Sequence, residues 1–160
     1  MTFRGLALVG VALAVTACAT WRPLEQRTTQ GPAAEEFWMY RVLLANGREP
    51  NFEERRHWQD QIDDRISRYL REHPEAANNL DVSTFRFYRR AAVGMSKEQI
   101  TILLGPPETV TTSPAEMEKL ARKYWPDIKG QAQEAWVYPL GWHLYFAESR
   151  LVDITQYRPR

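Results

Sequence analysis

The stretch that decides the fold is residues 93–107, VGMSKEQITILLGPP, because both ends of a short helix are specified within it. At the front, the side chain of Ser96 can accept from the amide of Gln99, and the Gln99 side chain can bond back to the backbone of Ser96. Met95 precedes this cap and is expected to pack on Ile100 as a hydrophobic staple. The pattern therefore predicts a helix that begins with a capping box.

The end of the same helix is equally well marked. Gly105 can take the left-handed conformation that closes a helix, and Pro106 and Pro107 cannot continue one. The sequence therefore predicts an eight-residue helix over 97–104, followed by a rigid corner. We expect this corner to join helices to a sheet and to have no chemistry of its own.

The residues after the corner indicate a second helix and then a sheet. Ser113 and Glu116 are predicted to form a second capping box, and Pro114 suits the first position of the helix that follows. Pro126 is expected to end that helix, which would span 114–125. The apolar residues then switch to a period of two, which predicts an antiparallel meander with helices on one face. Its three strands read EAWVY (134–138), WHLYF (142–146) and RLVDITQY (150–157).

The middle strand of the predicted meander has two different faces. Trp142, Leu144 and Phe146 alternate onto one face, which we expect to pack against helices. His143 and Tyr145 fall on the other face and are the candidate partner-binding residues, because aromatic side chains dominate the hot spots of interfaces. The alternative is that the helix preceding the sheet folds over this second face and hides it.

Residues 35–91 predict a helical extension before the corner. Its helical segments are expected over 35–45, 51–73 and 84–92. Gly47 is a plausible C-terminal cap of the first, Asn51 is the N-cap of the second, and Pro74 ends the second. The side chains expected to face inward are Phe37, Tyr40, Leu43, Leu44, Phe52, Trp58, Ile62, Ile66, Tyr69, Leu70, Phe85 and Tyr88.

The start of the chain has the pattern of a secretory signal peptide over residues 1–17. Arg4 is its single positive charge, and an uninterrupted apolar run extends from Gly5 to Val15. A run this short does not cross a bilayer as a permanent helix, which needs about 20 apolar residues. We therefore expect the segment to be removed.

The residues at the cleavage point resemble the bacterial lipobox. Val15, Thr16 and Ala17 form the signal cleavage motif, and Cys18 would be acylated and become the first mature residue. Cys18 is the only cysteine of the chain, so lipidation leaves no unpaired thiol in an oxidising compartment. By resemblance to Gram-negative sorting, Ala19 favours the periplasmic face of the outer membrane. Residues 18–34 contain two prolines and a glycine without apolar period, and are interpreted as the lipidated N-terminus and a flexible tether.

The lipobox, the corner and the meander together resemble the BamE-like (SmpA/OmlA) family of outer-membrane assembly lipoproteins over about residues 92–157. The matching motif consists of Gly94, Met95, Ser96, Gln99, Leu104, Gly105 and Pro107. The resemblance implies an α+β domain over 92–160 in which helices pack on a small antiparallel meander. It also implies an accessory role in the machine that inserts β-barrel proteins into the outer membrane.

The charge and the motif content limit the classes of function. Lysine and arginine total 21 and aspartate and glutamate total 20, and the signs alternate, so we expect no nucleic-acid partner. His57, His73 and His143 are widely separated, and the chain has no HExxH, CxxC or glycine-rich phosphate loop. We therefore expect no metal, no cofactor beyond acyl chains at Cys18, and no enzymatic activity.

Three functional hypotheses remain, and the first two belong to different classes of protein. The first is a lipid-anchored interaction module with outer-membrane lipid and a protein as partners, serving β-barrel assembly or envelope maintenance. The alternative is a periplasmic binding or inhibitory protein that presents an aromatic sheet face to an envelope hydrolase. The third is a small enzyme with an unrecognised site, which would need a concave pocket with convergent polar groups.

Overall fold

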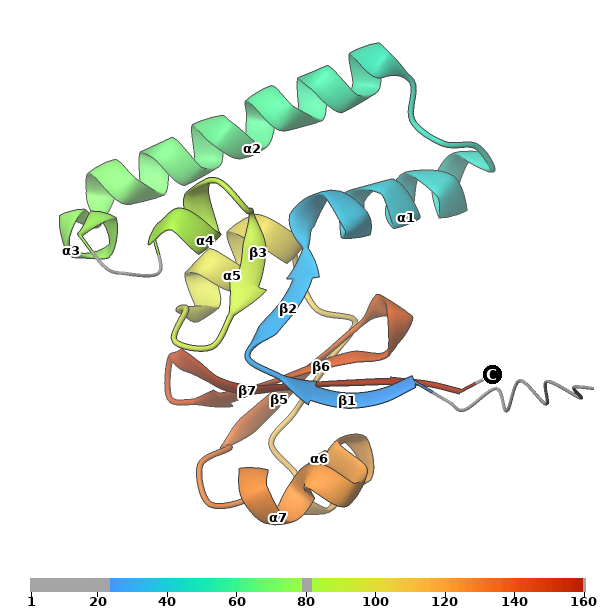
Figure 1. The fold of residues 1–160 in the computed structure, drawn as a ribbon, viewed down its shortest axis with the longest axis vertical. Coiled ribbons are helices and arrows are strands. Elements are labelled where there is room, and N and C mark those ends of the chain that lie inside the picture. The colour runs from blue at the N-terminus through green and yellow to red at the C-terminus, as the bar shows by residue number, and fades with distance from the viewer. Residues whose placement is uncertain (1–23, 79–81, 160) are drawn as a thin grey trace, which may run out of the picture.

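A five-stranded antiparallel sheet organises the protein, whose computed structural model describes residues 24–78 and 82–159. The strand order is β1-β7-β6-β5-β4, so the predicted meander forms its centre and the α+β class is confirmed (Figure 1). A separate two-stranded ribbon pairs β2 with β3. The strands are β1 (Leu24–Thr28), β2 (Gln30–Ala33), β3 (Arg90–Ala92), β4 (Thr109–Thr111), β5 (Glu134–Tyr138), β6 (Trp142–Ala147) and β7 (Arg150–Arg158).

Helices cover both faces of this sheet. In Figure 1, α1, α2, α4 and α5 lie on one side of the sheet, and α6 and α7 lie on the other. The helices are α1 (Ala34–Asn46), α2 (Phe52–Glu72), α3 (Pro74–Ala77), α4 (Val82–Arg86), α5 (Lys97–Leu104), α6 (Pro114–Ala121) and α7 (Trp125–Ile128), with 3-10 turns η1 (Arg122–Tyr124) and η2 (Pro139–Gly141). No helix in the described part of the chain is long and apolar enough to cross a membrane.

The predicted flexible tether is wrong for residues 24–33, which form two strands. β1 pairs along its whole length with β7, from Leu24 opposite Arg158 to Thr28 opposite Ile154. β2 then pairs with β3. The sequence LEQRT is mostly polar and shows no hydrophobic alternation, because an edge strand can be held by main-chain hydrogen bonds and ion pairs rather than by apolar burial.

The helical region before the corner shares one core with the sheet rather than forming a separate extension. Trp58, Ile62, Ile66 and Tyr69 are the buried stripe of α2, and they belong to the same apolar cluster as Phe146 of β6. The helix begins at the predicted cap, where the Asn51 side chain accepts from the Glu54 amide at 2.9 Å. α2 therefore docks on its own domain.

Four of the side chains predicted to face inward are exposed instead: Leu43, Leu44, Phe52 and Tyr88. Gly47 ends α1 in the left-handed conformation, as predicted, with its amide donating to the Leu43 carbonyl at 2.9 Å. Apolar residues occur on all sides of α1, so the helical period does not identify the buried face. Packing buries the face that holds Phe37 and leaves the second half of the helix open.

The N-terminal cap of α5 is as predicted, but the backbone conformation at its C-terminal end differs from the prediction. Ser96 Oγ accepts from the Gln99 amide at 3.1 Å, and the Ser96 amide donates to Gln99 Oε1 at 2.8 Å, which confirms the capping box. Gly105 has the expected positive φ of 74°, but its ψ of −170° is not the left-handed helical conformation. This region of φ and ψ is accessible essentially to glycine alone.

The predicted helix over 114–125 is interrupted. α6 ends at Ala121, and Arg122, the first residue of η1, takes a φ of 55° before α7 continues the chain. Pro126 lies inside the first turn of α7 and so does not end the segment. Ser113 caps α6 by accepting from the Glu116 amide at 3.4 Å, whereas the Glu116 side chain accepts from Thr111 instead of closing a capping box.

Candidate interaction site

The predicted partner-binding face of β6 is buried under α6 and α7. Tyr145 is fully buried and His143 is 8% exposed, so neither side chain is available to a partner in this structure. Tyr145 packs in an apolar cluster with Met117 and Ala121 of α6 and with Ile128 of α7. The prediction of an exposed face is therefore wrong, and the alternative of a covering helix is confirmed.

The covered face carries a row of polar groups that hydrogen-bond to one another. The hydroxyl groups of Tyr145 and Thr155 lie 3.2 Å apart, and Thr155 Oγ1 lies 3.4 Å from His143 Nδ1. Burial lowers the pKa of His143 to about 4 and raises the pKa of Tyr145. These groups join strands β6 and β7 under the helices and face no open surface.

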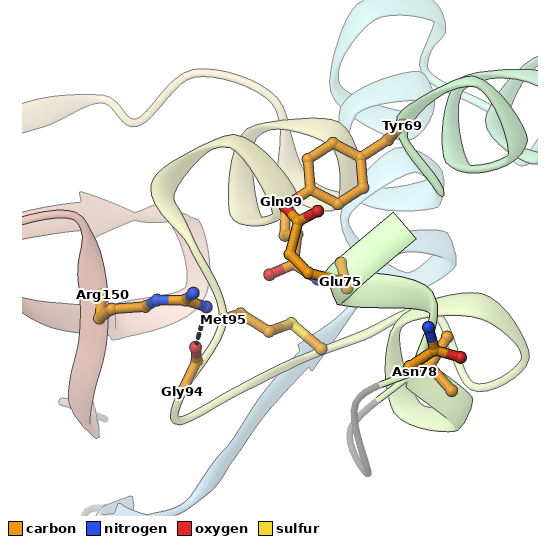
Figure 2. A pocket seen from close by; sticks show the side chains of 9 residues that line it. Tyr69, Glu75, Asn78, Gly94, Met95, Gln99 and Arg150 are labelled. Carbon is orange, nitrogen blue, oxygen red and sulfur yellow. Dashed lines mark hydrogen bonds between the residues drawn. The ribbon is translucent and has the colours of Figure 1, made fainter. Parts of the chain in front are cut away.

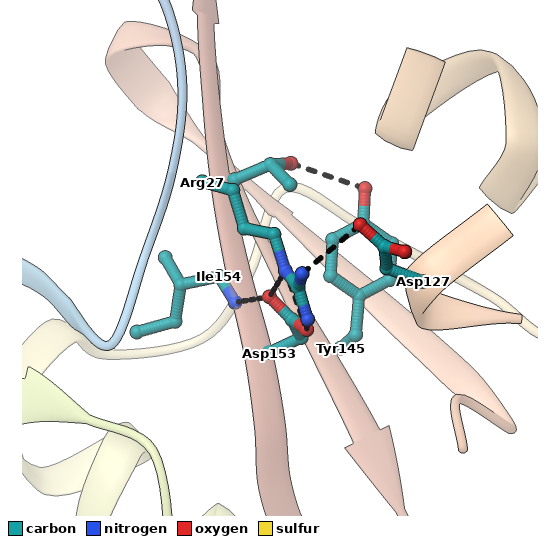
Figure 3. A network of polar contacts seen from close by, with 6 residues as sticks. Arg27, Asp127, Tyr145, Asp153 and Ile154 are labelled. Carbon is teal, nitrogen blue, oxygen red and sulfur yellow. Dashed lines mark hydrogen bonds and ion pairs between the residues drawn. The ribbon is translucent and has the colours of Figure 1, made fainter. Parts of the chain in front are cut away.

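An ion-pair network beside this row ties β1 to the sheet and to α7 (Figure 3). Arg27 donates to both carboxylate oxygens of Asp153, with the shortest contact 2.7 Å, and to Asp127 at 3.2 Å. Asp153 also accepts from the backbone amide of Ile154 at 2.9 Å. The network joins three elements, β1, β7 and α7, so we assign it a structural role.

The family-motif residues build the junction between α5 and the β6–β7 hairpin. The Gly94 amide donates to the Leu151 carbonyl at 2.8 Å, and the Leu151 amide donates to the Met95 carbonyl at 2.9 Å. The hydroxyl of Ser96 lies 3.3 Å from that of Tyr69 in α2. The remaining motif residues, Gln99, Leu104, Gly105 and Pro107, lie along α5 and its exit. The motif therefore holds the fold together, as its local pattern predicts.

A polar cavity of about 220 Å³ opens beside this junction (Figure 2). Tyr69, Glu75, Met95 and Gln99 line it, with Arg150 donating to the Gly94 carbonyl at 3.0 Å on the opposite wall. The chain between two further lining residues, Asn78 and Val82, lies outside the described residues. We therefore assign no function to this cavity.

The histidines are not brought together by the fold. His73 lies 3.1 Å from Glu75 and 3.6 Å from Glu98, and His143 is on the other face of the sheet from Ser96. Within residues 24–78 and 82–159, no group of three His, Cys, Asp or Glu side chains is placed to hold a metal ion.

Two neighbouring aromatic side chains stand out from the surface at the connection between α4 and β3. Phe87 is 70% exposed and Tyr88 is 72% exposed, although large aromatic residues usually bury most of their area. We call residues 86–89 the aromatic turn. Sequence reasoning missed it because a helical period was expected to continue through Tyr88.

The aromatic turn is held in place on both sides. The Phe87 amide donates to the Ser83 carbonyl at 2.9 Å, and the Arg89 carbonyl accepts from the Ala34 amide at 2.8 Å. Arg89 itself has a φ of 46°, which is uncommon for a residue with a side chain, and its guanidinium donates to both oxygens of Asp63 in α2 at 2.7 and 2.8 Å. The exposed aromatic pair is therefore presented on a fixed backbone.

A groove of about 370 Å³ runs between the aromatic turn and α2. Ile66 and Ser67 of α2 form one wall, and Arg86 and Phe87 form the other. The Arg86 guanidinium lies 5.3 Å from the centre of the Phe87 ring and makes no ion pair with any described residue. Aromatic residues and arginine are the types enriched at interface hot spots, and a partner that brings a carboxylate would complement Arg86.

The lipidation residue Cys18 and the cleavage motif Val15, Thr16 and Ala17 lie outside the described residues. No protein-family model, curated protein or solved structure matches this chain. The candidate site therefore rests on its own geometry.

Proposed function

We propose that this protein is a lipid-anchored, non-enzymatic lipoprotein of the periplasmic face of the outer membrane, which acts as an interaction module. The anchor is the acylated Cys18 indicated by the lipobox. The accessory role in β-barrel assembly or envelope maintenance follows from the resemblance of residues 92–157 to BamE-like domains. The protein partner is bound by the aromatic turn.

The single observation that carries the proposal is the exposure of Phe87 and Tyr88 on a rigid turn. Interfaces gain affinity when the contacting side chains are already ordered, because less conformational entropy is lost on binding. The bond from Arg89 to Asp63 and the main-chain bonds of the turn supply this order before any partner arrives.

The hydrolase-inhibitor alternative in its original form needed an exposed face on β6. That face lies under α6 and α7, so it is not available to a hydrolase. The enzyme hypothesis needed a concave pocket with convergent polar groups, and the polar cavity beside the junction, to which we assign no function, is the place that comes nearest to this description. Ser96 serves as a helix cap and His143 is buried behind the sheet, which supports a non-catalytic role.

The experiment that tests the proposal is site-specific photocrosslinking in intact cells. A photoreactive amino acid replaces Tyr88, and the same amino acid at Glu118, an exposed position on α6, is the matched control. We expect a defined adduct from position 88 that contains a subunit of the β-barrel assembly machinery, and none from position 118. The double variant Phe87→Ala/Tyr88→Ala should keep its melting temperature and lose co-purification with that machinery. Equal capture by the double variant, or identical adducts from both positions, would refute the proposal.

A further inference from the structure

The link between the proposed lipid anchor and the folded domain is short. β1 begins at Leu24, so only residues 19–23 separate the sheet from Cys18. A chain of this length spans at most about 20 Å even when fully extended. A domain of this size has a radius of gyration of about 14 Å, which corresponds to a diameter of about 37 Å. The anchor therefore reaches about half the width of the domain, so the start of β1 lies in the half of the domain nearer the membrane.

The start of β1 lies on the same side of the molecule as the connection between α1 and α2. In Figure 1, the beginning of β1, the end of β7 and the α1–α2 connection all project toward the right-hand edge. The aromatic turn, between α4 and β3, lies away from this edge. A membrane plane at the anchored side would thus meet the α1–α2 connection and leave the aromatic turn free.

Most of the exposed apolar side chains gather on this same side. Leu44 is 68% exposed and Phe52 is 73% exposed, one at the end of α1 and the other at the start of α2. Leu43 and Leu24 are exposed as well. Of the seven large apolar side chains exposed within the described residues, the other three are Phe87, Tyr88 and Val110. Apolar groups on the side of a domain that faces a membrane gain free energy by leaving water for the acyl boundary.

The α1–α2 connection is braced, so these side chains are presented rather than free to fold back. Trp38 of α1 stacks on Trp58 of α2 with ring centres 4.9 Å apart. Arg48 pairs with Glu54 at 2.7 Å, and Glu54 also completes the capping box at Asn51. These contacts join the two helices, while Leu44 and Phe52 remain exposed at the tip of the pair.

We infer that the α1–α2 connection, residues 43–52, is a second membrane contact that lies in the headgroup region of the leaflet holding the acyl chains. The inference rests on the proposed acylation of Cys18. Two contacts on one side fix the orientation of the domain, which directs the aromatic turn toward the periplasm. The occupant of this apolar surface is the lipid leaflet, not a second protein.

Single-cysteine labelling of the acylated full-length protein tests the inference. The sulfur of Cys18 is consumed by acylation, so Leu44→Cys and Phe52→Cys each offer one site for an environment-sensitive fluorophore. Tyr88→Cys and Glu118→Cys are the controls. The protein is reconstituted into vesicles of phosphatidylethanolamine and phosphatidylglycerol, with or without lipids that carry a nitroxide quencher. All four positions are exposed, so the variants should fold, and circular dichroism and the melting temperature verify this.

We expect the labels at 44 and 52 to shift their emission to the blue and to lose intensity with the nitroxide lipids, whereas the labels at 88 and 118 keep the spectrum of an aqueous site. Acylated protein that floats with the vesicles but shows no such difference would overturn this inference alone. A blue shift without lipid quenching would assign the surface to a second copy or another protein, and would also overturn it. Absence of acyl mass on Cys18, with no flotation, would overturn the anchoring proposal and this inference together.

Discussion

At Gly105, the corner after α5 adopts a backbone conformation that requires a residue without a side chain. Its φ of 74° and ψ of −170° suit glycine, and an added Cβ would lie 2.7 Å from Nη1 of Arg41. The end of an arginine side chain can move away, so the backbone strain is the lasting penalty. Arg89 and Arg122 also take positive φ values, and both are held by ion pairs with another element. Strain at single residues thus marks the places where elements are joined.

Gly105→Val should lower the free energy of unfolding by about 1 to 3 kcal/mol, because a β-branched residue is strained in this region of φ and ψ. Gly130→Val is the control, since a Cβ there would meet nothing within 4 Å. Denaturant unfolding of the two variants measures the difference. Equal stability of both variants would show that the corner tolerates a side chain.

His143 predicts a dependence of stability on pH. Its folded pKa of about 4 lies below the ordinary value of 6.5, so the unfolded chain binds more protons between these values. Stability from this group is therefore complete above pH 6.5 and declines as the pH falls toward 4. By pH 5 the loss amounts to about 2 kcal/mol for a shift of this size. Between pH 7 and pH 5, the melting temperature of the wild type should fall further than that of His143→Asn. Equal decreases in melting temperature would mean that His143 is protonated in the folded state at pH 5.

At the scale of elements, α6 and α7 act as a cover over one face of the sheet. Met117, Ala121 and Ile128 from the cover meet Tyr145 and Ala135 from the strands, which gives the protein a second, smaller core. On the other edge, β1 is tied down by the ion pair between Arg27 and Asp153. Two segments that were expected to be free, a tether and an open sheet face, are therefore parts of the folded domain.

Tyr145→Ala should destabilise the protein by about 3 to 5 kcal/mol, as large truncations of buried aromatic residues do. Tyr88→Ala removes the same side chain from an exposed site and should change stability by less than about 0.5 kcal/mol. Thermal melting of the two variants side by side gives the comparison. A mild effect of Tyr145→Ala would mean that the cover is easily opened.

At the scale of the whole molecule, the proposal implies one orientation of the domain relative to the membrane. It is defined by the proposed anchor, the α1–α2 connection and the aromatic turn. The proposed lipid contacts lie on the side where β1 begins, and the candidate protein contact, between α4 and β3, lies away from that side (Figure 1). If Cys18 is acylated as proposed, the five residues between it and β1 restrict how far the domain can turn relative to the membrane.

Cys18→Ser should abolish acylation, because no other cysteine exists to replace it. We expect the processed, acylated mass to disappear and the protein to leave the washed membrane fraction or remain as an uncleaved precursor. Mass spectrometry of each fraction measures this. A variant that still sediments with membranes at the wild-type mature mass would exclude the lipoprotein assignment.

The sequence by itself determined the local features of this fold. The capping boxes at Ser96 and Asn51 and the helix end at Gly47 depend on partners three or four residues away, so their chemistry is visible in a short window. The meander was equally visible, because alternation along a strand is a local property. These elements also contain the residues that resemble the BamE-like motif.

Only the tertiary structure decided which surfaces are open. Arg27 and Asp153 are 126 positions apart, and nothing near either residue indicates the other, so the pairing of β1 could not be predicted. The same holds for the cover over Tyr145 and for the exposure of Leu44, Phe52 and Phe87. A hydrophobic pattern indicates that a side chain can be buried. Which face is actually covered depends on how segments that are distant in the sequence pack together. The candidate interaction site was hidden from the sequence for this reason.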